Sequence, residues 1–203
     1  MRKIFEFIDI YPDISTFSII LIAIAVQMLI GNKIDAILPS ISLMLPTLLV
    51  TLPTNVLMKR AFKVRRPRRY YETVGGRDVF EGSFPSFHAQ FSAGEATTFV
   101  MGIYLFSPKA IRPIATLLAI LIVGTSSIII AISRVALGMH YAADAIGGFV
   151  FGILFGLCSV YSVAGFWREI SLLHHLAMIA TFVAIVFSLS ERQRWLRQKV
   201  ISG

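Results

Sequence analysis

The feature that most constrains this chain is a series of six apolar runs, each close to the roughly 20 residues with which a helix crosses a bilayer. The runs are Ile14–Ile30, Ile34–Met58, Ala89–Phe106, Ile111–Ile132, Tyr141–Phe166 and Leu172–Leu189. The second run contains Pro39, Pro46 and Pro53, and proline kinks or breaks the interior of a helix. We therefore predict an all-α fold, an integral membrane helical bundle of about six transmembrane helices, in a single domain over residues 1–203.

The composition agrees with a bilayer as the main solvent. Only 15% of the residues are charged and the mean hydropathy is +0.77, whereas a soluble domain carries about 25% charged residues. In a soluble protein the net charge of +8 would suggest nucleic acid. In so apolar a chain it favours basic residues that flank the membrane and a site for an anion. We expect the bilayer and an anionic ligand as partners, and no nucleic acid. The oligomeric state is left open.

The first polar cluster is strongly basic. Seven of the eleven residues from Lys59 to Arg69 are lysine or arginine, and none is acidic. Such a segment can flank a membrane helix and attract anionic headgroups. It can also bind a phosphate directly, because a guanidinium group donates two hydrogen bonds in one plane. The cluster alone does not decide between these interpretations.

The second cluster, Ser83–His88, comes directly before the third apolar run. Ser86 therefore lies near the start of a helix. A serine there caps the helix in many proteins. The same free N–H groups and hydroxyl can bind a phosphate. Both interpretations stay open at this point.

The third cluster, Ser133–Asp144, places ionisable residues at or near membrane level. Such residues are costly there and are usually functional. His140 and Asp144 are four residues apart, so they share a helix face. A carboxylate beside one imidazole nitrogen fixes the tautomer and leaves the other nitrogen free to attack. The alternative is a structural His–Asp pair, with Arg134 reaching toward the membrane surface.

The spacing of the runs brings the three clusters together. The 44 residues between His88 and Ser133 form two spans, so the chain crosses the membrane and returns. The second run delivers Lys59 to the same side. We therefore expect one site at the membrane–water interface, suited to a phosphate on an apolar tail. An even number of spans also puts both termini on this side. This side carries an excess of basic residues, which favours placing it in the cytoplasm. We expect a multi-pass protein of the cell (cytoplasmic) membrane.

Glu95 follows His88 by seven residues, with Ser92 between them. This spacing puts the three residues on one helix face. A carboxylate within a membrane span is expected to be buried against a partner or to line a cavity. We therefore predict that Glu95 faces the interior of the bundle.

Together these clusters resemble the type 2 phosphatidic acid phosphatase superfamily, which shares its site with the vanadium haloperoxidases. The family signatures are Lys-x6-Arg-Pro, Pro-Ser-Gly-His and Ser-Arg-x5-His-x3-Asp. This chain carries them as Lys59-x6-Arg66-Pro67, Pro85-Ser86-Phe87-His88 and Ser133-Arg134-x5-His140-x3-Asp144. The match covers residues 59–144, in the expected order and with the expected spans between the signatures.

The resemblance implies a role for each matching residue. It makes His140 the nucleophile that forms a phosphohistidine, Asp144 the residue that orients it, and His88 the group that protonates the leaving oxygen. The phosphoryl oxygens would be held by Lys59, Arg66, Ser86, the backbone N–H of Phe87, and Arg134. Phosphoryl transfer needs mainly positioning and charge stabilisation. Three cations can supply that, so we expect neither a metal ion nor another cofactor.

The expected activity is hydrolysis of a lipid phosphate, either a phospholipid phosphomonoester of the phosphatidate or phosphatidylglycerol phosphate type or a polyprenyl pyrophosphate. Phe87 departs from the family glycine, which permits a close backbone approach. Related lipid phosphotransferases carry bulky residues there, so transfer to an alcohol is an alternative. A haloperoxidase fits poorly with six spans. A non-catalytic protein that binds anionic lipid fits poorly with the presence of His88, His140 and Asp144 together.

Overall fold

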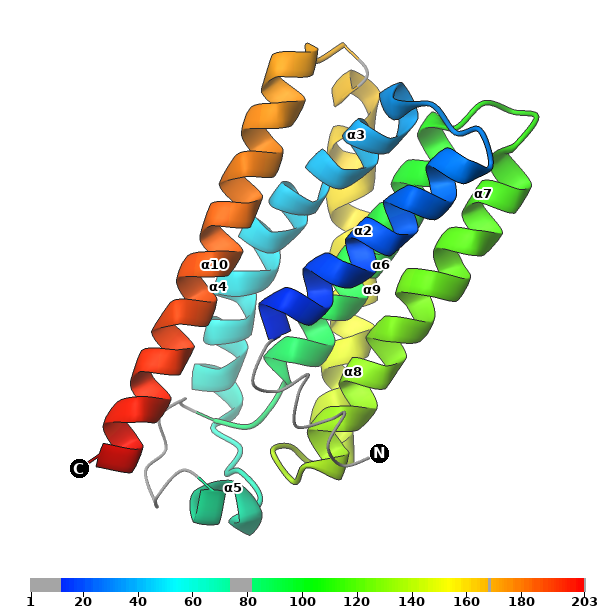
Figure 1. Cartoon of the computed structure of the whole chain (residues 1–203). Helices are drawn as coiled ribbons and strands as arrows, with labels where there is room; N and C mark the ends of the chain where they lie inside the picture. The colour runs from blue at the N-terminus through cyan, green and yellow to red at the C-terminus, as the bar shows by residue number, and fades with distance from the viewer. Residues whose placement is uncertain (1–11, 74–81, 168, 203) are drawn as a thin grey trace.

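The computed structural model describes residues 12–73, 82–167 and 169–202. Within these residues every regular element is a helix (Figure 1). The elements are α2 (Pro12–Leu29), α3 (Ile34–Ser42), α4 (Met44–Phe62), α5 (Arg68–Thr73), α6 (Phe87–Phe106), α7 (Arg112–Ala119), the π-helix η1 (Ile120–Gly124), α8 (Thr125–Ala136), α9 (Ala142–Trp167) and α10 (Leu172–Ser202). The prediction of an all-α fold is confirmed for the described residues.

The described helices include 4 that are long and apolar enough to cross a membrane: Ile34–Phe62, Arg112–Ala136, Ala142–Val163 and Leu172–Leu189. A shorter apolar helix covers Ile19–Leu29. These lengths fit a membrane protein, although they do not reach the six spans expected. Helix α6 is not among these four, because it is less apolar than they are. It carries the polar side chains of Gln90, Glu95 and Thr98, which are buried against other helices. Six spans therefore remain a prediction.

The second apolar run divides into two helices at Leu43, as its prolines suggested. Helix α4 then continues past the end of the run to Phe62, which places Lys59 in its last turn. Lys63 ends the helix in the left-handed conformation, at φ 49°, and its N–H donates to the carbonyl oxygen of Lys59. This helix end turns the chain toward Arg66.

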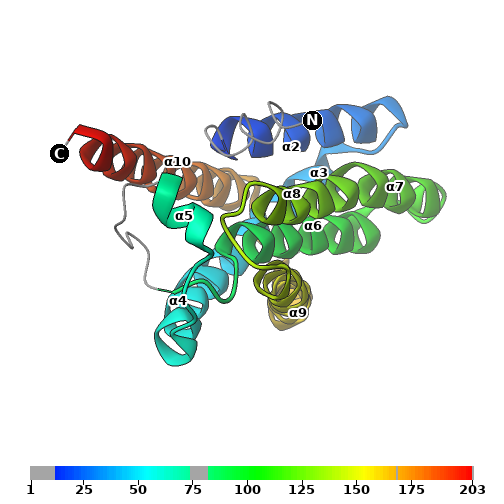
Figure 2. The same ribbon diagram turned by 90° about the horizontal axis from the view of Figure 1, so that it is seen from below.

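Helices α6 and α9 lie side by side, with α6 between α8 and α9 (Figure 2). Their backbones approach closely along glycines spaced four residues apart in α9. A Cβ atom added to Gly148 would lie 2.5 Å from the carbonyl oxygen of Ser86, and one added to Gly152 would lie 2.2 Å from that of Gln90. Residue numbers rise in the same order on both helices, so they run parallel. Both helices therefore begin at the same end of the bundle.

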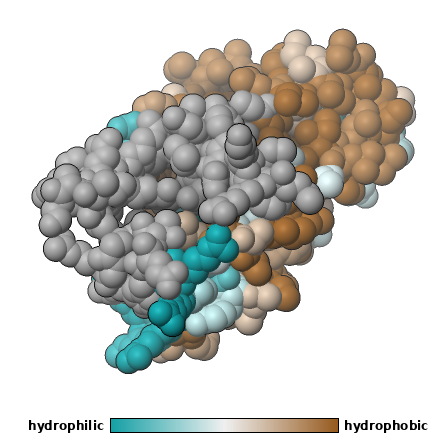
Figure 3. Space-filling view, turned by 60° about the horizontal axis from the view of Figure 1, so that its bottom comes forward, coloured by the Kyte–Doolittle hydropathy of each residue, from teal (hydrophilic) through white to brown (hydrophobic). Residues whose placement is uncertain are grey.

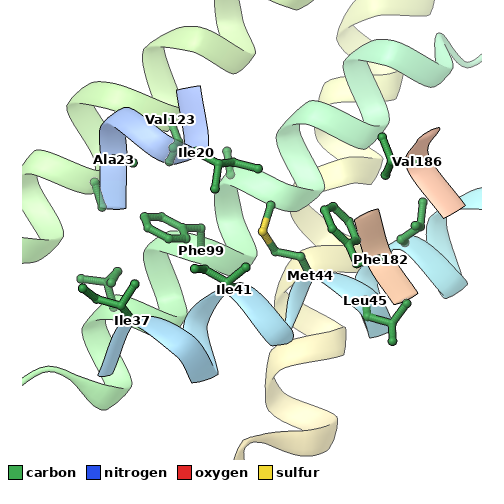
Figure 4. Packing of buried hydrophobic residues seen from close by; sticks show 14 of the residues in the cluster. Ile20, Ala23, Ile37, Ile41, Met44, Leu45, Phe99, Val123, Phe182 and Val186 are labelled. Carbon is green, nitrogen blue, oxygen red and sulfur yellow. The ribbon is translucent and has the colours of Figure 1, made fainter. Parts of the chain in front are cut away.

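The apolar core lies beside this helix pair, where Phe99 of α6 packs with Met44 of α4 and Phe182 of α10 (Figure 4). Polar side chains also join the helices within the bundle. The Thr47 and Thr98 hydroxyl oxygens are 2.7 Å apart. Such contacts replace water as hydrogen-bond partners inside a membrane protein. They fix the position of α4, and with it Lys59, relative to α6.

Glu95 faces the interior of the bundle, as predicted, and is only 4% exposed. Its carboxylate oxygens make no hydrogen bond to the described residues. The side chain lines a cavity of about 40 Å³ together with Ser92 and residues of α2, α4 and α8. The walls of this cavity are mostly apolar side chains such as Ile20, Phe99 and Ile130.

Candidate active site

The three polar clusters meet at one end of the bundle, where Figure 1 also places α5, the α8–α9 connection and the end of α10. The Ser83 N–H donates to the Val64 carbonyl oxygen at 2.7 Å, which joins the second cluster to the first. The Ser86 N–H donates to the Asp144 carbonyl oxygen at 3.0 Å, which joins the second cluster to the third. These backbone contacts hold the three clusters together at one end of the bundle, as the spacing of the runs predicted.

This end differs in polarity from the rest of the molecule. In Figure 3 hydrophilic side chains gather beside the site end, whereas hydrophobic residues cover much of the bundle behind it. Large apolar side chains such as Leu21, Leu57 and Leu121 are exposed on the described helices. Apolar flanks with a charged end suit a protein that lies in a bilayer, with its charged end at the membrane surface.

His140 lies in the connection between α8 and α9 and is 5% exposed. The expectation that it shares a helix face with Asp144 is wrong, because α9 begins only at Ala142. Gly138, at φ +72°, lets this connection turn, and the Arg69 side chain packs so closely on it that a Cβ atom would not fit. The imidazole Nε2 is 3.3 Å from Nη1 of Arg66. The other ring nitrogen, Nδ1, is 3.3 Å from the Ser83 hydroxyl oxygen and 3.6 Å from Oδ2 of Asp144.

These neighbours define the tautomer and charge of the imidazole. A guanidinium group only donates hydrogen bonds, so Nε2 accepts from Arg66 and Nδ1 carries the proton. The pKa of His140 is lowered to about 4, chiefly by burial and also by the positive charges of Arg66 and Lys59, against the opposing effect of Asp144. His140 is therefore neutral at pH 7, and the lone pair of its ring is on Nε2.

Asp144 is held by the start of α9, where it is 2% exposed. Its Oδ2 accepts a hydrogen bond of 2.9 Å from the Tyr141 N–H. This is the reach-back contact of a helix capping box, in which the third residue of the helix bonds the N–H of the cap. The same oxygen accepts a 2.5 Å hydrogen bond from the Ser83 hydroxyl. The carboxylate is thus fixed before any substrate binds.

Three basic residues of the signatures lie at this end. Arg66 is 7% exposed and stacks over the Tyr70 ring at 4.2 Å. Arg134, in the last turn of α8, is 1% exposed, and its Nε donates to the Ser133 hydroxyl at 3.2 Å. The Lys59 amino group donates to the Gly82 carbonyl oxygen at 3.2 Å. Three cations at one end of the bundle, two of them buried, are suited to an anion with several oxygens.

Ser86 takes the cap position of α6, but its side chain makes no capping hydrogen bond. The hydroxyl is fully buried and bonds none of the described residues. The capping interpretation of this serine is therefore not realised. Since buried hydroxyls are normally satisfied, this one is suited to a ligand oxygen.

Phe87 and His88 are the first two residues of α6. Phe87 has a helical backbone, since Lys63 is the only described residue other than glycine with a positive φ. The phenylalanine thus needs no backbone conformation reserved for glycine. Its ring stacks on Phe91, with centroids 5.8 Å apart, and Phe91 stacks on Phe182 of α10. His88 is half-buried and meets the Phe87 ring edge to face.

Two features of the site were not assigned from the sequence. Ser83 belongs to the second cluster but lies outside the signature, and its contact with Asp144 appears only in three dimensions. Tyr70 is 4% exposed and supports the Arg66 guanidinium, although nothing in the surrounding sequence singles it out. By contrast, the glycines of α9 had a readable signal, because small residues four apart in an apolar run indicate close helix packing.

The fold and the site define a class of protein: a helical, membrane-type protein with a neutral histidine, a fixed carboxylate and three basic residues at one end. A family model, that of the PAP2 superfamily, matches residues 39–168, more than half of the chain. The chain belongs to this superfamily, which confirms the resemblance drawn from the signatures. Members are typically phosphatases that act on phosphate esters, often of lipids. No curated protein and no solved structure matches the chain.

Proposed function

We propose that this protein is an integral membrane lipid phosphate phosphatase that works through a phosphohistidine on His140. The observation that carries the proposal is the state of the imidazole. It is neutral, its Nδ1 faces Ser83 and Asp144, and its Nε2 faces Arg66 at 3.3 Å. A nucleophile needs an unprotonated lone pair and a fixed orientation, and this arrangement supplies both.

Substrate binding begins with the phosphoryl oxygens. Lys59, Arg66 and Arg134 neutralise their charge, while the Ser86 hydroxyl and the Phe87 N–H donate hydrogen bonds. Arg66 moves from Nε2 of His140 to a phosphoryl oxygen, because an anionic oxygen is a stronger acceptor than a neutral nitrogen. The same movement frees the lone pair of the nucleophile. Binding of the phosphate and activation of His140 are thereby coupled.

In the first chemical step Nε2 attacks phosphorus. The new N–P bond forms as the bond from phosphorus to the lipid oxygen breaks, and His88 gives its proton to that oxygen. In the second step His88 removes a proton from water, the water oxygen bonds to phosphorus and the N–P bond breaks. Inorganic phosphate leaves and His88 is protonated again, as general acid–base catalysis requires. The three cations stabilise the equatorial oxygens in both steps.

Two observations support a lipid substrate. The site lies at one end of a bundle whose flanks are apolar, and the family often acts on lipids. The substrate we propose is a phospholipid phosphomonoester, of the phosphatidate or phosphatidylglycerol phosphate type, or a polyprenyl pyrophosphate. Three basic residues replace a metal ion, and the described residues contain no cluster of three His, Cys, Asp or Glu side chains that could hold one.

Release of inorganic phosphate from a panel of purified lipid phosphates in detergent tests the function. The His140→Ala variant is the blank, and a soluble phosphate ester is included to measure dependence on the lipid tail. Release from at least one lipid, absent in the variant, supports the proposal. No release from any lipid, with intact binding of anionic lipid by both proteins, would replace it with a non-catalytic role.

The alternative is a lipid phosphotransferase, which uses the same phosphohistidine but passes the phosphoryl group to an alcohol. The observation that favours it is Phe87, whose ring lies beside His88 where the family has glycine. An apolar ring beside the group that activates the acceptor disfavours water. Adding an alcohol to the assay distinguishes the two activities, because a transferase forms a new phosphate ester at the expense of inorganic phosphate.

A further inference from the structure

Among the described residues, His140 has a polar contact with Ser83, a residue that the family signatures do not include. The direct distance from Nδ1 of His140 to Oδ2 of Asp144 is 3.6 Å, too long for a hydrogen bond. The Ser83 hydroxyl oxygen lies beside them and contacts both, 3.3 Å from Nδ1 and 2.5 Å from Oδ2. We propose that Ser83 is a positioning residue through which Asp144 orients His140. The inference rests on the proposed function, in which His140 is the nucleophile.

The donors and acceptors of this chain are compatible in only one direction. An ionised carboxylate only accepts, so the Ser83 hydroxyl donates to Asp144. Its oxygen then has lone pairs for the Nδ1 proton of His140. Arg66 donates to the opposite nitrogen, which independently requires the proton on Nδ1. The result is an unbroken series in which Nδ1–H donates to Ser83 and Ser83 donates to Asp144.

Ser83 is placed rigidly enough for this role. Its side chain is fully buried, and its N–H donates to the Val64 carbonyl oxygen at 2.7 Å. The preceding residue, Gly82, accepts from the Lys59 amino group. Asp144, on the other side, is fixed by the Tyr141 N–H. The hydroxyl therefore bridges the third signature to the segment that follows the first.

The bridge matters most when the N–P bond forms. The imidazole then gains positive charge, and a hydroxyl polarised by a carboxylate stabilises that charge through Nδ1–H. Without the hydroxyl, Nδ1–H loses its nearest acceptor and the ring can turn or change tautomer. Loss of a buried hydrogen bond to a charged group corresponds to roughly a 10- to 100-fold effect. We therefore expect Ser83→Ala to lower kcat by about that factor, with little change in KM.

The central experiment is a double-mutant cycle with purified proteins. If Asp144 acts through Ser83, then Ser83→Ala has its full effect in the wild-type background and almost none when Asp144 is already alanine. Independent, multiplicative effects of the two substitutions overturn the proposal. Ser40→Ala is the matched control, because Ser40 is equally buried and, among the described residues, its hydroxyl bonds the Ala36 carbonyl oxygen, away from the site. It is expected to leave kcat unchanged.

A second measurement does not depend on turnover. Nitrogen-15 spectra of histidine-labelled protein, with the His140 signal assigned from His140→Ala, report which ring nitrogen carries the proton. We expect the Nδ1–H form in the wild type and a mixture of tautomers in Ser83→Ala. An unchanged tautomer overturns the bridge even if the phosphatase reaction is confirmed. The expected change in a protein that hydrolyses no lipid would support the bridge while the proposed function fails.

Two further variants separate positioning from folding. Ser83→Cys keeps the size of the side chain but donates weakly, so its kcat should lie between those of wild type and Ser83→Ala. Ser83→Thr keeps the hydroxyl. If its melting temperature is at least that of Ser83→Ala, it should recover most of the activity. Equal losses in the alanine, cysteine and threonine variants would show a merely structural residue. If Ser83→Ala does not fold, the cysteine variant decides in the same cycle.

Discussion

The N–H of Ser86 donates a hydrogen bond of 3.0 Å to the carbonyl oxygen of Asp144, which joins the start of α6 to the start of α9. Because the two helices run parallel, their N-terminal ends face the same site. The partial positive charges of both helix ends therefore add to those of the basic side chains. This single backbone contact places the hydroxyl of Ser86 and the second and third signatures in a common frame, in which a phosphate can meet all of them.

The close packing of α6 and α9 gives the first prediction. Gly152→Ala should lower both the melting temperature and the activity, because the new Cβ atom would lie 2.2 Å from the Gln90 carbonyl oxygen. Overpacking of this kind costs about 1–3 kcal/mol. Gly165→Ala in the same helix is the control, since nothing lies within 4 Å of that Cβ position. Thermal unfolding in detergent measures both. Equal melting temperatures would show that the register of the two helices is set elsewhere.

The second prediction concerns the nucleophile. His140→Ala should lower turnover by several orders of magnitude, because the other groups act only together with a covalent nucleophile. Acid-labile labelling of the protein by a radioactive lipid phosphate should disappear as well. His174→Ala is the matched control: this exposed histidine lies in the first turn of α10 and contacts Ser171, away from the site. Near-normal turnover by a folded His140→Ala protein would remove the phosphohistidine mechanism.

The third prediction is the titration of His140. Its pKa of about 4 lies below the usual 6.5, with burial as the largest cause and the charge of Arg66 as a further one. The nucleophile should therefore stay neutral through mildly acidic pH, and the nitrogen-15 signal of the substrate-free protein should titrate near pH 4. Arg66→Gln should raise the pKa, because it removes a neighbouring positive charge. Titration of the wild-type signal near pH 6.5 would contradict the burial that the structure shows.

The same shift has a consequence for stability. Between about pH 6.5 and 4 the unfolded chain binds a proton at this histidine that the folded protein does not. Protonation therefore favours the unfolded state in this window, and the contribution of His140 lowers the melting temperature as the pH falls. His140→Ala should remove this part of the pH dependence. Unfolding curves at pH 4.5 and pH 7 for the two proteins measure the difference.

The fourth prediction concerns the phosphate pocket. Activity should persist in excess chelator, because Lys59, Arg66 and Arg134 supply the positive charge that a metal ion would otherwise provide. Vanadate should inhibit, since it adopts a trigonal bipyramid that resembles the transferring phosphoryl group. Arg134→Ala should weaken inhibition by vanadate together with activity. Loss of activity in chelator, restored by a divalent cation, would contradict the proposed pocket.

Much of this arrangement was predictable because its causes are local. Apolar runs of bilayer length predicted the helices, and the spacing between His88 and Ser133 predicted that the clusters share one end. The spacing of His140 and Asp144 predicted that the two lie close together, but not that α9 begins between them and Asp144 caps it. The six-span count is not confirmed, because α6, which contains the third apolar run, carries buried polar side chains such as Gln90 and Glu95 and is less apolar than the four long helices. The bridge through Ser83 depends on a contact 61 residues apart in the chain, which no local pattern encodes.

The last prediction is the sidedness of the membrane. The end of α10 and the candidate site lie at the same end of the bundle in Figure 1, and the connection between α6 and α7 lies at the other. We propose that the site end faces the cytoplasm, because basic residues gather there. The basic residues that bind phosphate must be discounted, so the argument rests mostly on the four basic residues of the segment Arg192–Lys199. A cytoplasmic site would take its substrate from the inner leaflet, which favours a newly made phospholipid phosphate over a carrier pyrophosphate recycled outside.

Cysteine labelling in intact cells tests this orientation. Cys158 is exposed and is first replaced by alanine. Reporter cysteines are then placed singly at Gly203, at Arg68 in the site end, and at Lys109 between α6 and α7. A membrane-impermeant reagent should label only the Lys109 position, and all three should react after the membrane is opened. Labelling of Gly203 and Arg68 but not Lys109 would reverse the sidedness and favour the polyprenyl pyrophosphate. Labelling of only one of Gly203 and Arg68 would contradict an even number of spans between these two positions, that is, from α6 to α10.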